Sequence, residues 1–393
     1  MKRETIPFST PAVTGREIDN LTEVLRARRF TGNGPFAKAC RAWFAEVYGT
    51  PAALLTPSCT HALEMAALLG RVAPGDEVIL PSFTFTSTAT AFVRSGARLA
   101  FVDVRPDTMN IDPECVERAV TKRTRAIAVM DYAGVACDFD RIGEIARAHG
   151  LLLVEDAAQA LLATYNRRWC GTLADLGCIS FHETKNIHSG EGGCLLVNHE
   201  EMVGRAEIIQ EKGTDRSRFL RGEVDKYTWQ DCGSSFVLSE ISAAFLLAQL
   251  EHAKEIISDR CRTWALYHDA LAPLARRGTI GVPHVPDTCV HNGHIYYIKT
   301  KDKTDRDALI AFLKARGVQA TFHYVPLHSA PAGREFGRFV GEDRWTTRES
   351  ERLAFPCLMA WTRKRSRASW WQSRTTTRHR LYPQPGDIEE MSS

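Results

Sequence analysis

The chain has 393 residues, of which 44% are hydrophobic and 25% charged, and its formal net charge is +3. This is a globular mixture, and the length is sufficient for two domains. No apolar stretch approaches the ~18 residues that a membrane span needs, and the N-terminus lacks the apolar core of a signal peptide. These features exclude a membrane-spanning class, and we expect a cytoplasmic protein with no membrane partner.

The cysteines also limit the class of protein. Eleven of them are scattered along the chain, and no two form a Cys-x-x-Cys pair. An odd count at irregular spacing, in a chain without a secretion signal, indicates reduced and mostly buried thiols. We therefore expect neither a disulfide framework nor a metal site.

The first motif in the chain joins an apolar strand over 52–55 to a turn of hydroxyl residues and then a helical pattern. A helix N-terminus offers unpaired backbone N–H groups and the positive end of a dipole, so Ser58 and Thr60 are candidates for a phosphate cradle. The glycines of a P-loop are missing here. The local sequence favours the alternative interpretation, that Ser58 is an ordinary helix N-cap.

Alternating strands and helices follow. Short apolar runs recur along the chain at 77–80, 98–103, 125–130, 151–154, 178–180 and 194–197. Helical patterns lie between several of them, for example at 113–120 and 141–149. This alternation predicts a mostly parallel sheet covered by helices on both faces, which is an α/β fold.

The apolar run at 151–154 ends in two carboxylates, Glu155 and Asp156. The run predicts a buried parallel strand, and α/β sheets place their ligands at the carboxyl ends of such strands. A carboxylate there can pair with a protonated pyridine nitrogen. Because small helix formers come next, Asp156 as a helix N-cap is an equally open interpretation.

Lys185 is the most informative residue of the chain. It closes the run Ser180-Phe-His-Glu-Thr-Lys185, and glycines follow at 190, 192 and 193. A lysine amine at the end of an apolar strand is suited to imine chemistry with an aldehyde, above all with pyridoxal phosphate, when burial lowers its pKa. A solvated surface lysine is the alternative.

The later part of the chain predicts a second, smaller domain. A densely apolar helix runs over 239–250 toward Tyr267, too apolar for an exposed helix, and the segments 294–298, 306–316 and 320–324 predict strand, helix and strand. We expect a large cofactor domain over 1–250 and a small α+β domain over 251–353.

Two basic segments stand apart. One places four cations on a predicted loop, at Lys212, Arg216, Arg218 and Arg221, where they suit a diphosphate or form an ordinary solvated charge run. The other is the tail over 354–393, which has neither helical nor strand alternation and carries seven Lys or Arg and no Asp or Glu between 361 and 386. A frame-shifted gene end is our hypothesis for this tail, and a contact with nucleic acid is the weaker alternative.

Four segments together carry a family resemblance: Thr56-Pro-Ser-Cys-Thr60, Pro81-Ser-Phe-Thr-Phe85, Glu155-Asp-Ala-Ala-Gln159 and Ser180-Phe-His-Glu-Thr-Lys185. In their order and residue identities they resemble the pyridoxal-phosphate sugar-nucleotide aminotransferases. Those enzymes have the aspartate aminotransferase fold, known as fold type I. The resemblance runs from about Ile6 to Leu353. It implies pyridoxal 5'-phosphate as cofactor and Lys185 as the catalytic residue, which bonds the cofactor aldehyde and shuttles a proton.

The resemblance also implies further site residues. Asp156 is expected at the pyridine nitrogen, Gln159 near the phenolic oxygen and Phe85 on the ring face. The phosphate contacts are expected from Ser58, Cys59, Thr60 and Ser180. The segment Phe322-His323-Tyr324 resembles one near the sugar, although His323 as a histidine in a core turn is the alternative.

Two positions depart from the family. After the glycine of Trp229-Gln-Asp-Cys-Gly233, many members have an asparagine that reaches a neighbouring subunit's phosphate, and here Ser234 stands in its place. Relatives more often show histidine at the position of Asp131, whose role stays open.

The reaction implied is transfer of the amino group of L-glutamate to C4 of dTDP-4-keto-6-deoxy-D-glucose. The product is dTDP-4-amino-4,6-dideoxy-D-galactose, used for cell-surface polysaccharide of the enterobacterial common antigen type, and the expected state is a homodimer that binds no nucleic acid. Amination at C3 is one alternative. The other is a catalytically impaired scaffold or regulator, if the altered C-terminus has removed the helix that closes the small domain. A C3 dehydratase of the same family has histidine in place of Lys185, which speaks against that activity.

Overall fold

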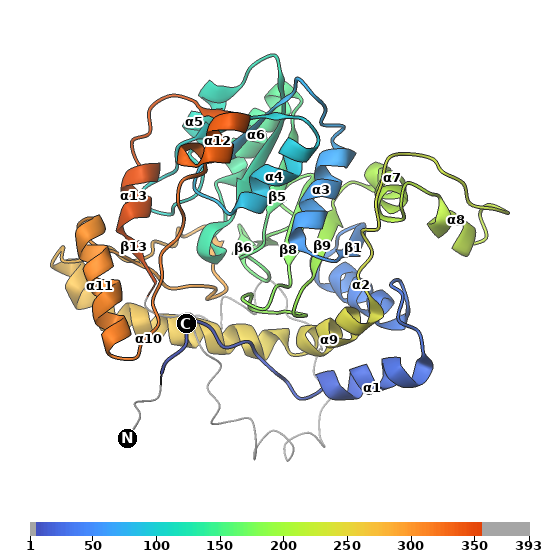
Figure 1. The fold of residues 1–393 in the computed structure, drawn as a ribbon, viewed down its shortest axis with the longest axis horizontal. Helices are drawn as coiled ribbons and strands as arrows, with labels where there is room; N and C mark the ends of the chain where they lie inside the picture. Colours follow the sequence, from blue (N-terminus) through green and yellow to red (C-terminus); the bar gives the residue numbers. More distant parts are fainter. Residues whose placement is uncertain (1–4, 356–393) are drawn as a thin grey trace.

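A central sheet of eight strands forms the core of the molecule (Figure 1). The computed structural model describes residues 5–355, and the predicted tail from 356 onward lies outside these described residues. The sheet order is β1-β9-β8-β5-β4-β2-β3-β12, and only β9 runs against the other strands. The prediction of a mostly parallel sheet is therefore confirmed. The eight strands are β1 (Ala52–Thr56), β2 (Glu77–Pro81), β3 (Arg98–Val102), β4 (Thr124–Met130), β5 (Leu152–Asp156), β8 (Leu176–Ser180), β9 (Gly193–Val197) and β12 (Gly337–Phe339).

Helices cover both faces of this sheet (Figure 1). On one face lie α2, α5, α6, α9 and α10, and on the other lie α3, α4 and α7. The helices of the described chain are α1 (Glu17–Ala27), α2 (Pro35–Tyr48), α3 (Cys59–Leu69), α4 (Thr86–Arg94), α5 (Pro113–Ala119), α6 (Phe139–His149), α7 (Glu200–Gln210), α8 (Arg216–Leu220), α9 (Glu240–Leu250), α10 (Ala253–Arg276), α11 (Lys303–Ala315), α12 (Pro331–Phe336) and α13 (Thr346–Arg352). Two short 3-10 turns, η1 (Tyr132–Gly134) and η2 (Leu327–Ser329), follow β4 and precede α12.

Alternation along the strands explains the two-faced core. In β2, Ile79 packs into one apolar cluster, whereas Val78 and Leu80 pack into the cluster on the opposite face. All three side chains are fully buried. A strand that buries both faces has to be apolar throughout, which is why the sequence shows continuous apolar runs instead of a polar-apolar alternation.

The remaining strands form two small sheets. Strands β10 (Cys289–Val290), β6 (Thr164–Tyr165) and β7 (Arg168–Trp169) form one, and β11 (Ile298–Lys299) with β13 (Leu353–Ala354) forms the other. In Figure 1, α10, α11, α13 and β13 lie together beside the central sheet. Strand β12, although it comes late in the chain, joins the central sheet next to β3, so the expected small domain contributes one strand to the large one.

Several predicted elements of the C-terminal half differ from the structure. The strand over 294–298 is reduced to β11, and the strand over 320–324 is wrong, because only Thr321 pairs there, with Phe355. The expected continuous helix from Ser239 is two helices, since the chain turns between α9 and α10. All residues of 294–298 are nevertheless buried, so the apolar pattern there reflects burial and not strand pairing.

The residues of β13 and Phe355 continue the folded chain past the start of the predicted tail. Ala354 pairs with Ile298, and Phe355 is fully buried. Among the described residues, no helix has both the length and the apolar composition that crossing a membrane requires.

Asp103, at the end of β3, joins the C-terminal segment to the central sheet. Its buried carboxylate accepts hydrogen bonds from the backbone N–H groups of Arg344, Trp345 and Thr346 at 3.0, 3.1 and 2.8 Å, and from the Thr346 hydroxyl at 2.6 Å. One carboxylate thereby satisfies the unpaired donors at the start of α13.

We predict that Asp103→Ala lowers the free energy of unfolding by ~2–4 kcal/mol, because it leaves several buried N–H groups unpaired. Asp302→Ala is the matched control, since Asp302 caps α11 with a single exposed bond to the Asp305 N–H. A cap of that kind contributes ~1 kcal/mol. Urea unfolding of both variants checks the prediction, and an equal loss in the two would contradict it.

Candidate functional site

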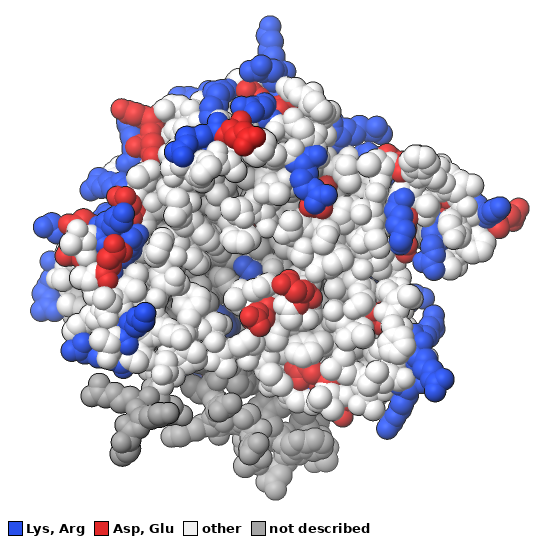
Figure 2. Space-filling model, in the orientation of Figure 1, with Lys and Arg blue, Asp and Glu red and all other residues white. Residues whose placement is uncertain are grey.

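A cavity of about 360 Å³ lies at the carboxyl ends of the parallel strands. It is bordered by the ends of β4, β5 and β8 and by the starts of α3 and α4. Figure 2 shows a hollow on this side of the molecule, with a basic side chain at its floor and acidic side chains near its rim. Ten of the residues predicted from the sequence line the cavity: Ser58, Cys59, Thr60, Phe85, Asp156, Gln159, Ser180, Lys185, His323 and Tyr324.

Asp156 is the last residue of β5, and its carboxylate is held by neighbours on both sides. The Thr88 hydroxyl donates to Oδ2 at 2.6 Å, and the Ala158 N–H donates to Oδ1 at 3.2 Å. Burial raises the pKa of Asp156, while these two hydrogen bonds and the charge of Lys185 lower it in part. No helix follows Asp156 in the structure, so the N-cap interpretation is wrong. A buried carboxylate fixed in this way is suited to receive a cationic N–H.

Lys185 lies in the turn between β8 and β9, where its backbone N–H donates to the His182 carbonyl at 2.8 Å. Burial lowers the pKa of its amine, and the nearby Cys59 and Asp156 side chains raise it in part. A lowered pKa leaves more of the amine neutral near pH 7, which is the form that attacks a carbonyl or accepts a proton. The interpretation as a solvated surface lysine does not describe this position.

The start of α3 meets the cavity as a set of donors. Ser58 is the N-cap, and its hydroxyl accepts from the His61 N–H at 3.3 Å, so the N-cap interpretation and the location at the cavity are both correct. The first helical N–H groups, of Cys59 and Thr60, stay available to an anion at the positive end of the helix dipole. A Cβ on Gly193 would lie 2.4 Å from the Cys59 nitrogen, so β9 can approach this turn only with a glycine there.

Gln159 joins the cavity to the turn after β4. Its Oε1 accepts from the Ala133 N–H at 2.7 Å, and its amide Nε2 donates to the Tyr324 hydroxyl at 3.1 Å. Tyr324 stacks on His323 with ring centroids 4.3 Å apart. Burial, together with the charge of Lys185, lowers the pKa of His323 to about 3, so this histidine is neutral.

Phe85 and Ser180 complete the predicted cavity set. Phe85 precedes α4 and is 57% exposed, although its ring reaches within 6.4 Å of Tyr324 between centroids. An aromatic side chain so exposed at a cavity mouth is free to cover a flat ring. Ser180, by contrast, is buried at the end of β8, and its hydroxyl accepts from the His182 N–H at 3.4 Å.

In a single chain, the four predicted cations lie away from this cavity. They lie on the segment 211–235, which contains α8 and projects from the body after α7 (Figure 1). Each pairs with a glutamate of the same region: Lys212 and Arg216 with Glu211, Arg218 with Glu223, and Arg221 with Glu207 and Glu223. Arg216 and Arg218 lie on the short helix α8, so the prediction of a loop was wrong for them. Ser234 is exposed on the same projecting segment.

Sequence reasoning missed several residues that line the cavity or hold its lining residues in place. Thr88 fixes Asp156, and the hydroxyl run Thr84-Phe-Thr-Ser-Thr88 at the start of α4 was the signal that could have revealed it. His294 lines the cavity and bonds the Asn186 side chain through Nδ1 at 3.0 Å. Phe8 also lines it, and nothing in its local sequence distinguishes it from any other aromatic residue.

The donor set fits pyridoxal phosphate. A flat pyridine aldehyde with a phosphate needs a carboxylate for its ring nitrogen, an amine for its aldehyde and N–H donors for its phosphate. Asp156, Lys185 and the start of α3 supply these three groups around one cavity. The neutral His323 and the aromatic rings supply the remaining walls.

Comparison with known proteins gives the same assignment. Residues 11–354 match the model of the DegT/DnrJ/EryC1/StrS aminotransferase family, and the match ends where the tail begins. The chain is 32% identical to the spore coat polysaccharide biosynthesis protein SpsC of Bacillus subtilis over 333 residues, 83% of this chain and 85% of SpsC. It is 33% identical to GDP-perosamine synthase of Caulobacter vibrioides over 328 residues, 83% of this chain and 86% of that protein.

A solved structure extends the likeness to the cofactor. The putative sugar aminotransferase Spr1654 from Streptococcus pneumoniae, in its PLP form, superposes with a TM-score of 0.79 at 26% identity, covering 90% of this chain and 94% of that one. The aminotransferases of this family depend on pyridoxal phosphate, and the cavity around Lys185 contains the groups that the cofactor requires. This chain therefore belongs to the DegT/DnrJ/EryC1/StrS family of pyridoxal-phosphate-dependent sugar aminotransferases.

Proposed function

We propose that this protein transfers the amino group of L-glutamate to C4 of a dTDP-linked 4-keto-6-deoxyglucose, in the cytoplasm, as a step in polysaccharide synthesis. One observation carries the proposal. The Lys185 amine, whose pKa is lowered by burial, shares a cavity with the buried Asp156 carboxylate and the N-terminus of α3. That set suits amine transfer between two carbonyl compounds.

Each group has one task in this proposal. Bound pyridoxal phosphate supplies an electron sink for the carbon that loses its proton. Lys185 takes the proton from one carbon and returns it to the next through its amine. Asp156 keeps a proton on the ring nitrogen, because its buried carboxylate is most stable opposite a positive N–H. The Thr88 hydroxyl prevents the carboxylate from turning away.

In this proposal, the aromatic wall of the cavity orients the substrate. Tyr324 is fixed by Gln159 and by its stack on His323, so its hydroxyl can be offered to a sugar oxygen at a constant position. Since His323 is neutral, it adds no positive charge beside Lys185.

The diphosphate of the nucleotide needs positively charged side chains. The four predicted cations of one chain lie away from that chain's own cavity. We infer a homodimer in which the segment 211–235, with Lys212, Arg216, Arg218 and Arg221, reaches the partner's cavity, and Ser234 contacts the partner's cofactor phosphate. The projection of this segment and the 82% exposure of Trp229 support that arrangement, since large exposed aromatic residues are enriched at interfaces.

Two alternatives for the substrate remain open to experiment. Amination at C3 is one, because no residue of the cavity distinguishes C3 from C4. The other is a GDP-linked sugar, which the likeness to GDP-perosamine synthase favours. The likeness to SpsC supports a product used in polysaccharide synthesis, without specifying which polysaccharide.

Lys185→Ala is expected to lose the visible absorbance of lysine-bound cofactor and to slow turnover by at least ~10³-fold, because it removes both the covalent bond and the mobile base. Lys314→Ala, on the exposed side of α11, is the control and should behave as the wild type. Spectra with and without glutamate and single-turnover rates give the measurement. Full activity of Lys185→Ala would refute the assignment, and a colourless wild type that binds no cofactor would support the scaffold alternative.

Mixing variants tests the proposed dimer. Lys185→Ala and the double variant Arg216→Ala/Arg218→Ala are each expected to be weak alone, whereas their heterodimer has one intact site. Random mixing makes half of the dimers heterodimers, so activity should return to about a quarter of the wild-type value. No recovery, despite subunit exchange seen by native mass spectrometry, would place the cations at their own chain's site or away from any site.

Incubation with glutamate and dTDP-4-keto-6-deoxyglucose is expected to give dTDP-4-amino-4,6-dideoxygalactose. Two-dimensional NMR of the product identifies the aminated carbon and its configuration. A GDP-linked keto sugar under the same conditions is the competing substrate. Preference for the GDP sugar, or nitrogen at C3, would replace the proposed substrate while leaving the transaminase assignment intact.

A further inference from the structure

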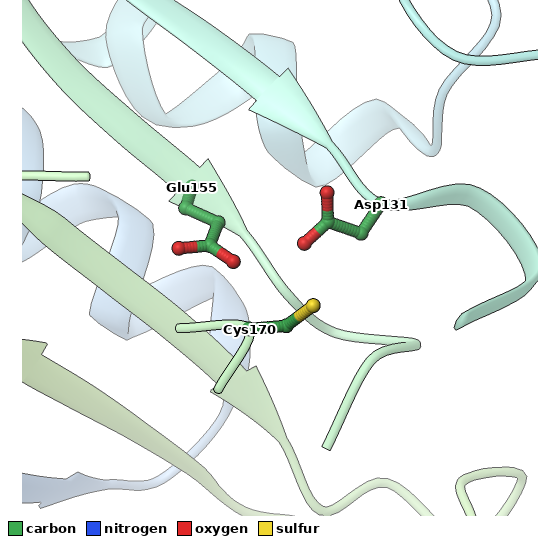
Figure 3. Close-up of side chains that lie close together, drawn as sticks. All are labelled: Asp131, Glu155 and Cys170. Atoms are coloured by element: carbon green, nitrogen blue, oxygen red, sulfur yellow. The ribbon is translucent and has the colours of Figure 1, made fainter. Parts of the chain in front are cut away.

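Two carboxyl groups lie directly behind the cavity, on neighbouring strands. Asp131 follows the end of β4, and Glu155 is the residue before Asp156 in β5. The parallel register pairs Val129 with Glu155. Both carboxyl groups are 0% exposed, and their oxygens lie within 4.8 Å of one another and of the Cys170 sulfur. Figure 3 shows the two carboxyl groups facing each other, with Cys170 beside them.

The hydrogen bonds of the two groups are unequal. One oxygen of Glu155 accepts from the Gly171 N–H, and the other accepts from the Leu173 N–H at 3.0 Å. Asp131 Oδ1 accepts from the Cys137 N–H at 2.9 Å, whereas Oδ2 has no partner among the described residues other than the facing carboxyl group. Buried polar atoms without a donor or acceptor are rare, because each costs ~1–3 kcal/mol.

Within residues 5–355, no cation is among the groups that interact with this pair. The titratable groups that act on it from the surrounding elements are Cys137, Asp156, Cys170, Cys178, Cys289 and Tyr48. None of these is a cation. Two like charges this close together, on side chains that are 0% exposed, cannot both be ionised near neutral pH.

We propose that Asp131 and Glu155 share one proton, carried on Oδ2 of Asp131 and donated to Glu155, and that this protonated pair positions Asp156 and Gln159 for the transamination. The positioning part rests on the proposed function, whereas the shared proton does not. The location of the proton follows from the hydrogen bonds. Both Glu155 oxygens already accept from backbone N–H groups, and only Oδ2 of Asp131 has room for a hydrogen.

The pair is connected to the cofactor groups through the backbone. The Asp131 N–H donates to the Asp156 carbonyl at 3.2 Å. Two residues farther on, the Ala133 N–H donates to Oε1 of Gln159 at 2.7 Å. Glu155 is joined covalently to Asp156. Loss of the shared proton would make the two strand ends repel each other, and both cofactor residues would move with them.

The direction of the pH dependence follows from burial. Burial raises the pKa of both carboxyl groups, and repulsion between them raises further the pKa at which the pair loses its shared proton. The two groups titrate as a unit. The folded state thus keeps a proton that the unfolded chain has already lost near neutral pH. Stability from the pair is complete below the ordinary carboxyl pKa and falls as the pH rises through the raised value.

A metal ion held by Asp131, Glu155 and Cys170 is the competing explanation. Divalent transition metals need about four ligands at 2.0–2.3 Å with deprotonated thiols, and this cluster offers three groups. Burial raises the pKa of the Cys170 thiol, which keeps it protonated. A Glu155 oxygen that bound the ion would have to do so beside the N–H donor from which it already accepts. The proton explanation needs no further ligand and no deprotonated thiol.

The test uses infrared spectra and metal analysis of the purified full-length protein. The wild type at neutral pH should show a carbonyl stretch of a buried protonated carboxylic acid, and Asp131→Asn should lose it, because the amide N–H replaces the shared proton. Cys170→Ser is the matched control and should keep the band. A stoichiometric metal lost in Cys170→Ser, or no acid band in the wild type, would overturn the proposal.

Cofactor affinity of the apoprotein tests the positioning part. Asp131→Asn should bind pyridoxal phosphate within ~3-fold of the wild type, since the donor to Glu155 remains. Asp131→Ala and Glu155→Gln should bind pyridoxal phosphate at least ~10-fold more weakly. Asp131→Ala removes the side-chain donor to Glu155, and Glu155→Gln turns an amide N–H toward a backbone N–H. Tight binding by Glu155→Gln with weak binding by Asp131→Asn would overturn the assignment of the proton to Asp131.

The pH profile separates this role from simple packing. The wild-type affinity for pyridoxal phosphate and its urea midpoint should both fall as the pH rises above the ordinary carboxyl pKa and through the raised pKa of the pair, and Asp131→Asn should flatten both curves. Identical curves for the two proteins would overturn the proposal. These measurements use no sugar and no turnover, so their outcome does not depend on which substrate the enzyme aminates.

Discussion

Burial of a parallel sheet on both faces is the constraint on which the rest of this structure depends. Since β2, β4, β5 and β8 cannot place polar groups on either face, their polar residues gather at the strand ends. Asp156, Ser180 and Asp131 all stand within one residue of such an end. The helices that return from this edge bring their N-termini to the same place. The site is thus a consequence of the sheet's burial and its direction.

The same burial determines the electrostatics of the site. Removing the amine of Lys185 from water lowers its pKa, and removing the carboxyl group of Asp156 raises its pKa. Their mutual attraction acts against both shifts. Behind them, Asp131 and Glu155 have no cation to offset their charge, so a proton takes its place. One desolvated region therefore contains a base ready to move protons, a carboxylate fixed by Thr88 and a neutralised acid pair.

Much of the candidate site followed from local sequence. Strand-end carboxylates and the Lys185 turn are visible as breaks in apolar runs, and the Ser58 turn is visible as a helix start. Thr88 escaped detection because its importance depends on a contact with a residue 68 positions away. His294 and Phe8 escaped for the same reason, because nothing in their own segments marks them as residues that reach the cavity. The four cations were chosen for their charge, and only the fold shows that they lie on a projecting segment away from their own chain's cavity.

The sequence by itself determined the α/β class, the order of the central strands along the chain and the family, because continuous apolar runs and short motifs are local properties. It also predicted Lys185 as the reactive lysine. The tertiary structure decided the strand order across the sheet, the place of β12 beside β3, the absence of a strand at 320–324 and the meeting of Asp131 with Glu155. These depend on packing between residues far apart in the chain. The role of Asp131, open in the sequence, became interpretable only when a second carboxyl group was found facing it.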